Sequence, residues 1–348
     1  PQYNGIKLCR AGASPIGRDS GLSDIRALLD TELPPRDGPA GSVRQQDFLQ
    51  AYADYLLSLV DLSTMRRLKV VVDAGNGMAG HTVPTVFADL NVDLVPLYFE
   101  LDGTFPHHEA NPIEPANLVD LQAKVRETGA DIGLAFDGDA DRCWVIDERG
   151  ESVSPSAITA LVAVRELAKH PGATIIHNLI TSKGVPEIVA EHGGVPVRTR
   201  VGHSFIKAEM ARTGAVFGGE HSAHYYFRDF WFADSGMLAA MHVLAALGEQ
   251  ERALSEVAGA YSRYHASGEV NSTVSDQAEA LRRVRAAFAG RGEFDEIDGL
   301  TVTGSGWWFN LRPSNTEPLL RLNAEAADES TMTAIRDEVL AIVGKVSE

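Results

Sequence analysis

Apolar runs of strand length alternate with segments of helical periodicity along most of the chain. Several runs are rich in Val and Ile, whereas the segments between them repeat apolar residues every three to four positions. This alternation is typical of an α/β protein, in which helices cover a largely parallel sheet. The predicted strands are 69–73, 92–99, 131–136, 143–146, 174–177, 196–201, 307–311 and 319–324, together with a strand–loop–strand over 215–227 and a hairpin around 298–299. The predicted helices are 78–90, 117–128, 155–168, 185–191, 234–247, 276–288 and 330–343, with another after 202–204.

Local residue types refine two of these elements. Asn117 is a favoured N-cap residue for the helix that follows it, and Gly129 is suited to ending that helix in the left-handed conformation. The segment 75–77, Gly-Asn-Gly, lacks the full glycine spacing of a dinucleotide site. We therefore interpret it as a structural turn.

The alternation divides the chain into successive units. We predict an α/β domain over 49–151, a second α/β domain over 152–264 and an α+β domain over 265–348, because the composition shifts after the second unit. Residues 1–48 are too short to form a domain of their own. Within them, the Pro- and Gly-rich stretch 34–39 is typical of a linker.

Charge and cysteine content exclude several classes of function. The net charge of −17 argues against binding to nucleic acid or to an anionic membrane, since both would be repelled. No apolar run has membrane-spanning length, and no secretory signal opens the sequence. The two cysteines suggest neither a disulfide framework nor a zinc site. These features predict a reducing compartment, the cytoplasm.

The most informative segment is 137–142, Asp-Gly-Asp-Ala-Asp-Arg, which joins two apolar runs. Asp137, Asp139 and Asp141 would repel one another unless a cation lay among them, and Mg²⁺ is the hard divalent ion that such oxygen ligands favour. Arg142 would then be free to meet a second anion, such as a phosphate.

Three other interpretations compete for this segment. A solvated surface turn is the simplest, but apolar strands flank the segment closely. The carboxylates also match the ligand spacing of an EF-hand, yet Arg142 stands where that loop needs glycine, and the flanks are not helical. A haloacid-dehalogenase-type phosphatase would need a second acidic motif, which is not found.

The segment 312–318, between two predicted strands, has the groups that bind a phosphate. Arg312 can donate two hydrogen bonds, while Ser314, Asn315 and Thr316 offer neutral donors beside a row of backbone N–H groups. A polar hairpin remains an alternative, since these are also common turn residues.

The segment 218–224 has the groups that bind a sugar. Glu220 and Ser222 can hydrogen-bond hydroxyl groups, and His224 can meet a phosphate or move a proton. His203 opens a predicted helix, whose N-terminal amides can bind an anion. Purely structural roles for both histidines stay open.

Four segments, in order, resemble the α-D-phosphohexomutases, and within that family the phosphomannomutase/phosphoglucomutase group. They are 3–7, 137–142, 219–224 and 312–318. The resemblance implies four domains, of which the chain matches the last three, with 1–48 as a remnant of the first. It also implies that the family's nucleophilic phosphoserine would precede Pro1.

The resemblance implies a complete site. Phosphoryl groups would move between the 1- and 6-positions of mannose or glucose phosphates through a phosphoserine and a bisphosphorylated sugar. Mg²⁺ would be held by Asp137, Asp139 and Asp141, and catalytic roles would fall to Lys7, Arg142 and His224. The implied substrate-binding residues are His203, Glu220, Ser222, His224, Arg312, Ser314, Asn315 and Thr316.

Some residues of the sugar-binding segment depart from the family pattern. His221 and Ala223 stand where the mannose/glucose enzymes usually have Met and Gly, whereas Asn315 favours that class.

Without its serine, 1–348 alone is expected to be inactive as a mutase. A catalytically dead sugar-phosphate-binding protein and a Mg²⁺-dependent sugar phosphatase are the competing hypotheses.

Overall fold

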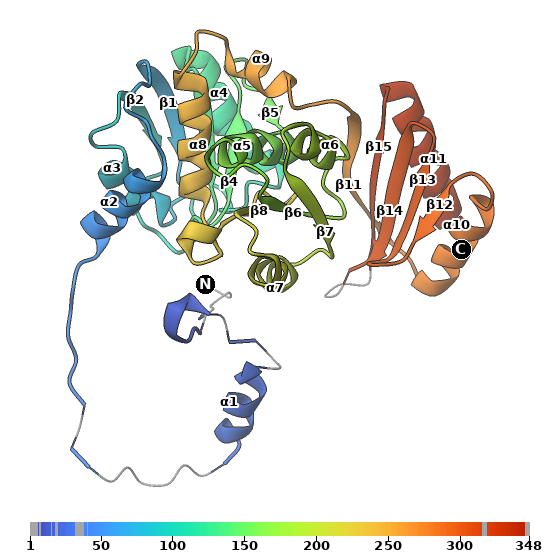
Figure 1. Ribbon diagram of the computed structural model, residues 1–348, viewed down its shortest axis with the longest axis horizontal. Helices are drawn as coiled ribbons and strands as arrows, with labels where there is room; N and C mark the ends of the chain where they lie inside the picture. Colours follow the sequence, from blue (N-terminus) through green and yellow to red (C-terminus); the bar gives the residue numbers. More distant parts are fainter. Residues whose placement is uncertain are drawn as a thin grey trace.

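Three five-stranded sheets follow one another along the part of the chain that the structure describes (Figure 1). The first two combine parallel and antiparallel strands with helices, and the third is antiparallel throughout. The predicted α/β class, with a smaller α+β unit at the end, is confirmed. The computed structural model describes residues 6, 8–14, 16–17, 20–31, 38–39, 41–314 and 319–344.

The first sheet has the strand order β2-β1-β3-β4-β5. Its parallel core pairs β1 with both β2 and β3, after which β4 and β5 run antiparallel. Every residue of β3 is buried, as expected for an apolar strand covered on both faces. The strands are β1 (Leu68–Asp73), β2 (Val92–Leu97), β3 (Ile132–Phe136), β4 (Cys143–Ile146) and β5 (Ser152–Val153).

The second sheet repeats this topology in the order β7-β6-β8-β9-β10. Its parallel core pairs β6 with β7 and β8, and β9 and β10 follow antiparallel. The segments 137–142 and 220–224 therefore occupy equivalent positions, each joining the third strand of its sheet to the fourth. The strands are β6 (Thr174–Asn178), β7 (Val195–Thr199), β8 (Phe217–Gly219), β9 (Tyr225–Phe227) and β10 (Ala233–Asp234).

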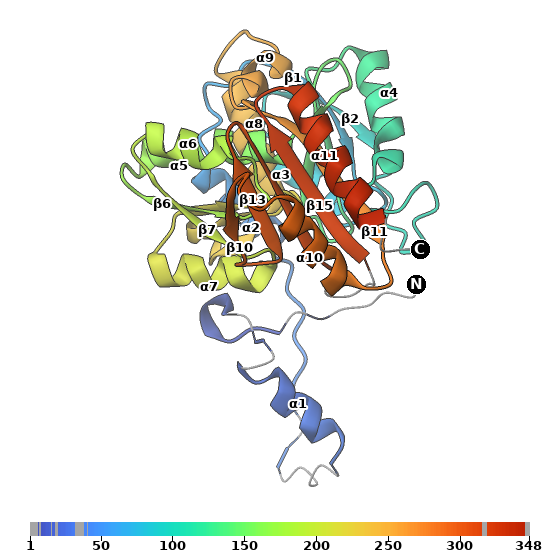
Figure 2. The same ribbon diagram turned by 90° about the vertical axis from the view of Figure 1, so that its right-hand side faces the viewer.

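The third sheet has the order β11-β15-β14-β13-β12 and is covered by α10 and α11 (Figure 2). Asp276 caps α10 through a hydrogen bond from the backbone N–H of Glu279. The elements are β11 (His265–Thr273), α10 (Gln277–Ala287), β12 (Glu293–Asp295), β13 (Leu300–Gly304), β14 (Trp307–Pro313), β15 (Leu319–Ala326) and α11 (Glu329–Gly344).

One continuous apolar core joins the first two sheets, whereas the third sheet has a core of its own. Helix α5 packs on β8, α8 packs on β4, and the two helices pack on each other. The two repeats are therefore held in one body. The α-helices of this body, α5 and α8 included, are α2 (Leu49–Leu59), α3 (Ala79–Val86), α4 (Val119–Thr128), α5 (Pro155–Lys169), α6 (Gly184–Glu191), α7 (His203–Thr213), α8 (Gly236–Gly248) and α9 (Leu254–Gly259).

The start of α4 differs from the prediction. A 3-10 turn, Pro115–Leu118, precedes the helix, and the Nδ2 of Asn117 donates to the carbonyl of Asn111 instead of capping α4. The end of α4 agrees with the prediction, since Gly129 adopts φ 61° there. Strand β11 was not predicted, because it is a polar edge strand without a continuous apolar run.

Helix α1 (Leu22–Leu29), near the start of the chain, lies away from the three sheets in both views (Figures 1 and 2). It buries none of its residues. Across the described residues, no helix combines the length and the apolar character needed to cross a bilayer.

Candidate functional site

The acidic loop 137–142 begins where the buried strand β3 ends. Asp137 is 4% exposed, and its carbonyl accepts a hydrogen bond from the N–H of Ala140 at 3.1 Å. Ala140 adopts φ 62°, a left-handed conformation that closes the tight turn. The turn gathers the three carboxylates, so that one oxygen from each of Asp137, Asp139 and Asp141 lies within 4.8 Å of the others.

Arg142, the last residue of the acidic loop, pairs with Asp137, the first carboxylate of that loop. Its backbone N–H donates to Asp137 Oδ1 at 3.1 Å, and its Nε donates to Asp137 Oδ2 at 2.8 Å. Its Nη1 donates to Asn111 Oδ1 at 3.3 Å, so Asn111 fixes the far end of the guanidinium. Arg142 is therefore held by Asp137 in this conformation, because the buried carboxylate attracts the nearest cation. Its expected contact with a second anion beside a bound metal stays a prediction.

The electrostatics of this loop fit a divalent cation. The pKa of Asp137 is raised to about 6, chiefly because the carboxylate is buried; Arg142 opposes the shift and Asp141 adds to it. A carboxylate that is costly to ionise beside another carboxylate is stabilised by an added positive charge. The three oxygen donors are also the ligand type that Mg²⁺ prefers. The residues present therefore fit this ion.

The turn at 75–77 packs directly against the acidic loop. The N–H of Met78 donates to the carbonyl of Gly138 at 3.0 Å. A Cβ on Gly77 would lie 2.7 Å from that same oxygen, so only glycine allows this approach. At the start of the turn, Asp73 accepts from the N–H of Gly75 and pairs with His108 Nε2 at 2.9 Å.

The sugar loop, defined as residues 220–224, begins with a buried carboxylate. Glu220 is 3% exposed, and its Oε2 accepts from the hydroxyl of Tyr226 at 2.9 Å. Its Oε1 accepts from Asn178 Nδ2 and from the N–H of Gly202, both at 3.3 Å. Burial alone would raise the pKa of Glu220, but hydrogen bonds from His224, Tyr226 and Asn178 outweigh it and lower that pKa. Glu220 is therefore held ionised.

His224 connects the sugar loop to the acidic loop. Its Nδ1 lies 2.9 Å from Ser222 Oγ and 3.3 Å from Glu220 Oε2, and its Nε2 lies 3.6 Å from Asp141 Oδ1. Burial would lower the pKa of His224, but Glu220 and Asp141 raise it above its usual value. A backbone bridge between Arg142 and His224 aligns the two loops. The equivalent loops of the two repeats therefore form one site.

His203 lies at the same place. It begins α7, and its Nδ1 lies 3.1 Å from the hydroxyl of Tyr226 and 3.2 Å from Asp234 Oδ2. Its ring is 6.0 Å from the ring of His224. Asp234, which sequence reasoning missed, comes from the short edge strand β10, where no pattern marks it as functional.

The segment 312–318 is only partly described. Arg312 is buried at the end of β14, and its Nη2 donates to Glu269 Oε2 at 3.0 Å. Burial lowers the pKa of Arg312, although Glu269 opposes the shift. Arg321, opposite Arg312 in the register of β14 and β15, reaches Ser314 Oγ at 3.3 Å and was missed from sequence. Lys7, Asn315 and Thr316 lie outside the described residues.

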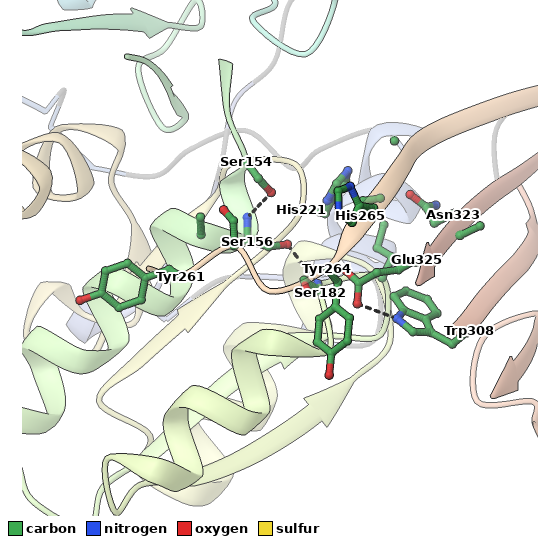
Figure 3. A pocket seen from close by; sticks show the side chains of 16 residues that line it. Ser154, Ser156, Ser182, His221, Tyr261, Tyr264, His265, Trp308, Asn323 and Glu325 are labelled. Atoms are coloured by element: carbon green, nitrogen blue, oxygen red, sulfur yellow. Dashed lines mark hydrogen bonds between the residues drawn. The ribbon is translucent and has the colours of Figure 1, made fainter. Parts of the chain in front are cut away.

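A cavity of about 310 Å³ lies where β11 and β15 meet the second repeat (Figure 3). Glu325 lies on its wall and accepts from Trp308 Nε1 at 2.9 Å. Of the sugar loop, only His221 lines this cavity, and none of the predicted site residues does. Burial lowers the pKa of His221. The cavity therefore adjoins the sugar loop at His221, while the described residues of the predicted site lie outside its lining.

Models of known protein families match most of the chain. The Phosphoglucomutase/phosphomannomutase alpha/beta/alpha domain II matches residues 50–150, and the alpha/beta/alpha domain III matches residues 154–264. The C-terminal domain of the same family matches residues 269–342.

Similar proteins of known name agree with these matches. A phosphomannomutase of Salmonella montevideo is 41% identical over 351 residues, covering 98% of this chain and 77% of that protein. A phosphomannomutase of Escherichia coli is 42% identical over 353 residues, with the same coverage. Both likenesses span the acidic loop and the sugar loop.

Solved structures share the fold. A phosphoglucomutase/phosphomannomutase family protein from Burkholderia thailandensis has a TM-score of 0.82 and 32% identity, covering 95% of this chain and 70% of that one. An N-acetylphosphoglucosamine mutase from Aspergillus fumigatus, in complex with GlcNAc-6P and magnesium, has a TM-score of 0.62 and 16% identity. It covers 86% of this chain and 65% of that one, and its likeness extends to the fold alone.

Proposed function

The chain belongs to the phosphoglucomutase/phosphomannomutase family of intramolecular phosphotransferases, and we propose that it interconverts the 1- and 6-phosphates of mannose, glucose or both. The observation that carries this proposal is the contact between the acidic loop and the sugar loop, with His224 Nε2 3.6 Å from Asp141 Oδ1. A metal site would thereby lie beside a hydroxyl-binding site, as transfer of a phosphoryl group to a sugar oxygen requires. We also propose the domain limits 1–48, 49–151, 152–264 and 265–348, which the family matches at 50–150, 154–264 and 269–342 support.

Mg²⁺ is the proposed ion of the acidic loop, held by Asp137, Asp139 and Asp141. The magnesium bound to the Aspergillus fumigatus relative supports this assignment. When bound, the ion would neutralise charge on the phosphoryl oxygens. Arg142 would add a second positive charge on the same side, held in place by Asn111.

The sugar loop would bind the hexose. The lone pairs of Glu220 already accept from Tyr226, Asn178 and Gly202, and its longest bond is to Ser222 Oγ at 3.5 Å. A sugar hydroxyl would therefore bind by replacing that bond, so that Glu220 accepts from the hydroxyl while the Ser222 hydroxyl turns to meet a neighbouring one.

Positively charged side chains at the two ends of the substrate would hold its phosphates. The raised pKa of His224 favours its protonated form, which suits an anion and can return a proton to the leaving oxygen. His203 would contact the same end of the substrate. Arg312 and Ser314 would hold the phosphate that is not reacting, and Arg321, which reaches Ser314, would strengthen that grip.

The remaining roles fall outside the described residues. We propose that a phosphoserine carries the phosphoryl group and that a bisphosphorylated sugar forms between its two transfers. Asn315 and Thr316 would complete the grip on the distal phosphate, and Lys7 would act as a general acid or base. The expected inactivity of 1–348 by itself stays a prediction.

The test is the rate at which the protein in its natural form converts mannose 1-phosphate to mannose 6-phosphate. Asp139→Ala should lower this rate roughly 10²- to 10³-fold, because an ion that stabilises transferring charge is worth several kcal/mol. Asp89→Ala, at an exposed position outside the loop, is the matched control and should keep the wild-type rate. A comparable rate in Asp139→Ala would refute the metal assignment, and release of inorganic phosphate would favour a phosphatase.

A further inference from the structure

Two histidines and one carboxylate converge beside the sugar loop in a way that sugar binding alone does not require. His203, His224 and Asp234 each offer one ligand atom, and these atoms lie within 4.8 Å of one another. Two imidazoles with one carboxylate form a set that suits borderline metals such as Zn²⁺, whereas the all-carboxylate acidic loop suits Mg²⁺. The two clusters therefore differ in the ion that they favour.

Asp234 provides a second and independent observation. Its side chain is 6% exposed, and its Oδ2 accepts no hydrogen bond from any described residue. The oxygen lies 3.2 Å from His203 Nδ1, with which it forms an ion pair when that imidazole is protonated. A buried carboxylate is costly unless a positive charge meets it, and a metal ion shared with His203 would supply that charge when the imidazole is neutral. Oδ2 of Asp234 faces the imidazole of His203, and the two side chains would bind the same cation.

His224 is already oriented as a metal ligand. Ser222 Oγ and Glu220 Oε2 lie 2.9 and 3.3 Å from its Nδ1, which places the ring proton on that nitrogen. Its Nε2, which lies 3.6 Å from Asp141 Oδ1, is then the ring nitrogen that a metal would bind once the imidazole is neutral. Support of one ring nitrogen by a carboxylate is the usual arrangement for a histidine that binds a metal through the other.

We propose that His203, His224 and Asp234 form a transition-metal site for Zn²⁺, which adjoins the acidic loop but uses a different set of ligands. Tetrahedral Zn²⁺ needs ligand atoms about 3.4 Å apart, so side-chain shifts of about 1 Å would complete the site, with water as the fourth ligand. A metal ion at this site would be coordinated by both histidines, which would then be unavailable to bind a phosphate. If the proposed function holds, the metal and the sugar phosphate would therefore exclude each other, and Zn²⁺ would inhibit.

Co²⁺ provides a direct test, because tetrahedral Co²⁺ absorbs visible light strongly and octahedral Co²⁺ does so weakly. Titration of the metal-free 348-residue chain should give an intense visible band that saturates at one equivalent and disappears when Zn²⁺ is added. Asp234→Asn and His203→Gln should each weaken Co²⁺ binding by more than about 100-fold, since loss of a group that merely supports a ligand costs 10- to 100-fold.

Control variants separate this site from others. Asp139→Asn in the acidic loop and His81→Gln at an exposed histidine should both keep the band. In a Cys9→Ser background, which removes the exposed thiol, His203→Cys should keep the metal and add a thiolate-to-cobalt charge-transfer band in the near ultraviolet. Circular dichroism of each metal-free variant checks that the fold is retained.

The proposal is overturned by any of three results. These are an intense band that persists in Asp234→Asn, a band lost in Asp139→Asn, or a weak octahedral spectrum in the wild-type chain. All three readouts are spectroscopic, so they do not depend on mutase activity. A failure of the proposed function would leave the Co²⁺ spectrum unchanged.

Discussion

Gly77→Ala tests how the 75–77 turn supports the acidic loop. The new Cβ would lie 2.7 Å from the carbonyl oxygen of Gly138, 2.9 Å from its Cα and 3.1 Å from the carbonyl oxygen of Ala74. All three are backbone atoms, so no side-chain rotation can relieve the contact. Since relaxed contacts to carbon are about 3.5 Å or longer, the two segments must separate by roughly 0.5–1 Å.

This separation should lower the stability of the fold and weaken the binding of Mg²⁺. Overpacking against a fixed backbone costs about 1–3 kcal/mol in the free energy of unfolding. Metal ligands need placement to within about 0.5 Å, so the displaced loop should also bind Mg²⁺ more weakly. A tenfold rise in the dissociation constant would remove about 1.4 kcal/mol of the stabilisation that saturating Mg²⁺ provides.

Thermal unfolding with EDTA and with a series of Mg²⁺ concentrations measures both effects. Gly103→Ala is the matched control, because a Cβ there meets no atom within 4 Å. This control should keep the wild-type response to Mg²⁺ and a stability unchanged or raised by up to about 1 kcal/mol. If Gly77→Ala unfolded and responded to Mg²⁺ as Gly103→Ala does, the account of the loop and its metal would be refuted.

Two further predictions concern stability. Tyr226→Phe should lower the free energy of unfolding in urea by about 2 kcal/mol, because it removes a hydrogen bond to the buried Glu220 carboxylate; Tyr225→Phe, whose hydroxyl has no partner among the described residues, should be neutral or stabilising. Equal losses in both would contradict this. Asp73 raises the pKa of His108 from 6.5 to about 8, so this pair stabilises the fold below pH 6.5 and the contribution is lost as the pH rises through 8. The 1.5-unit shift corresponds to about 2 kcal/mol, reduced to about 1 kcal/mol by partial exposure. Unfolding measured from pH 6 to 9 should show this decline in the wild type and not in His108→Gln, and an unchanged decline in the variant would exclude the pair as its source.

Local sequence patterns were sufficient to predict the acidic loop as a structural feature. Asp137, Asp139 and Asp141 alternate with small residues between two apolar runs, and those runs form β3 and β4. Strand length and apolar content are local properties, which is why they could be inferred from one sequence. The repeat of topology between the first two sheets could not, because it is carried by strand pairing and not by residue identity.

The partners of the predicted residues also depended on tertiary structure. Arg142 could be placed beside the acidic loop, but its bond to Asn111 joins positions 31 residues apart. Arg321 meets the phosphate-binding segment only because the register of β14 and β15 sets it opposite Arg312. Asp234 lies on a two-residue strand that carries no pattern. Such pairings follow from packing and register, which no local signal records.

The activity proposed for this protein is the movement of a phosphoryl group within a hexose phosphate. Phosphorus NMR of the protein in its natural form, incubated with mannose 1-phosphate, Mg²⁺ and a hexose bisphosphate activator, tests it most directly. We expect the mannose 6-phosphate signal to grow as the mannose 1-phosphate signal falls, with no inorganic phosphate. Growth of inorganic phosphate alone, or an unchanged spectrum, would contradict it.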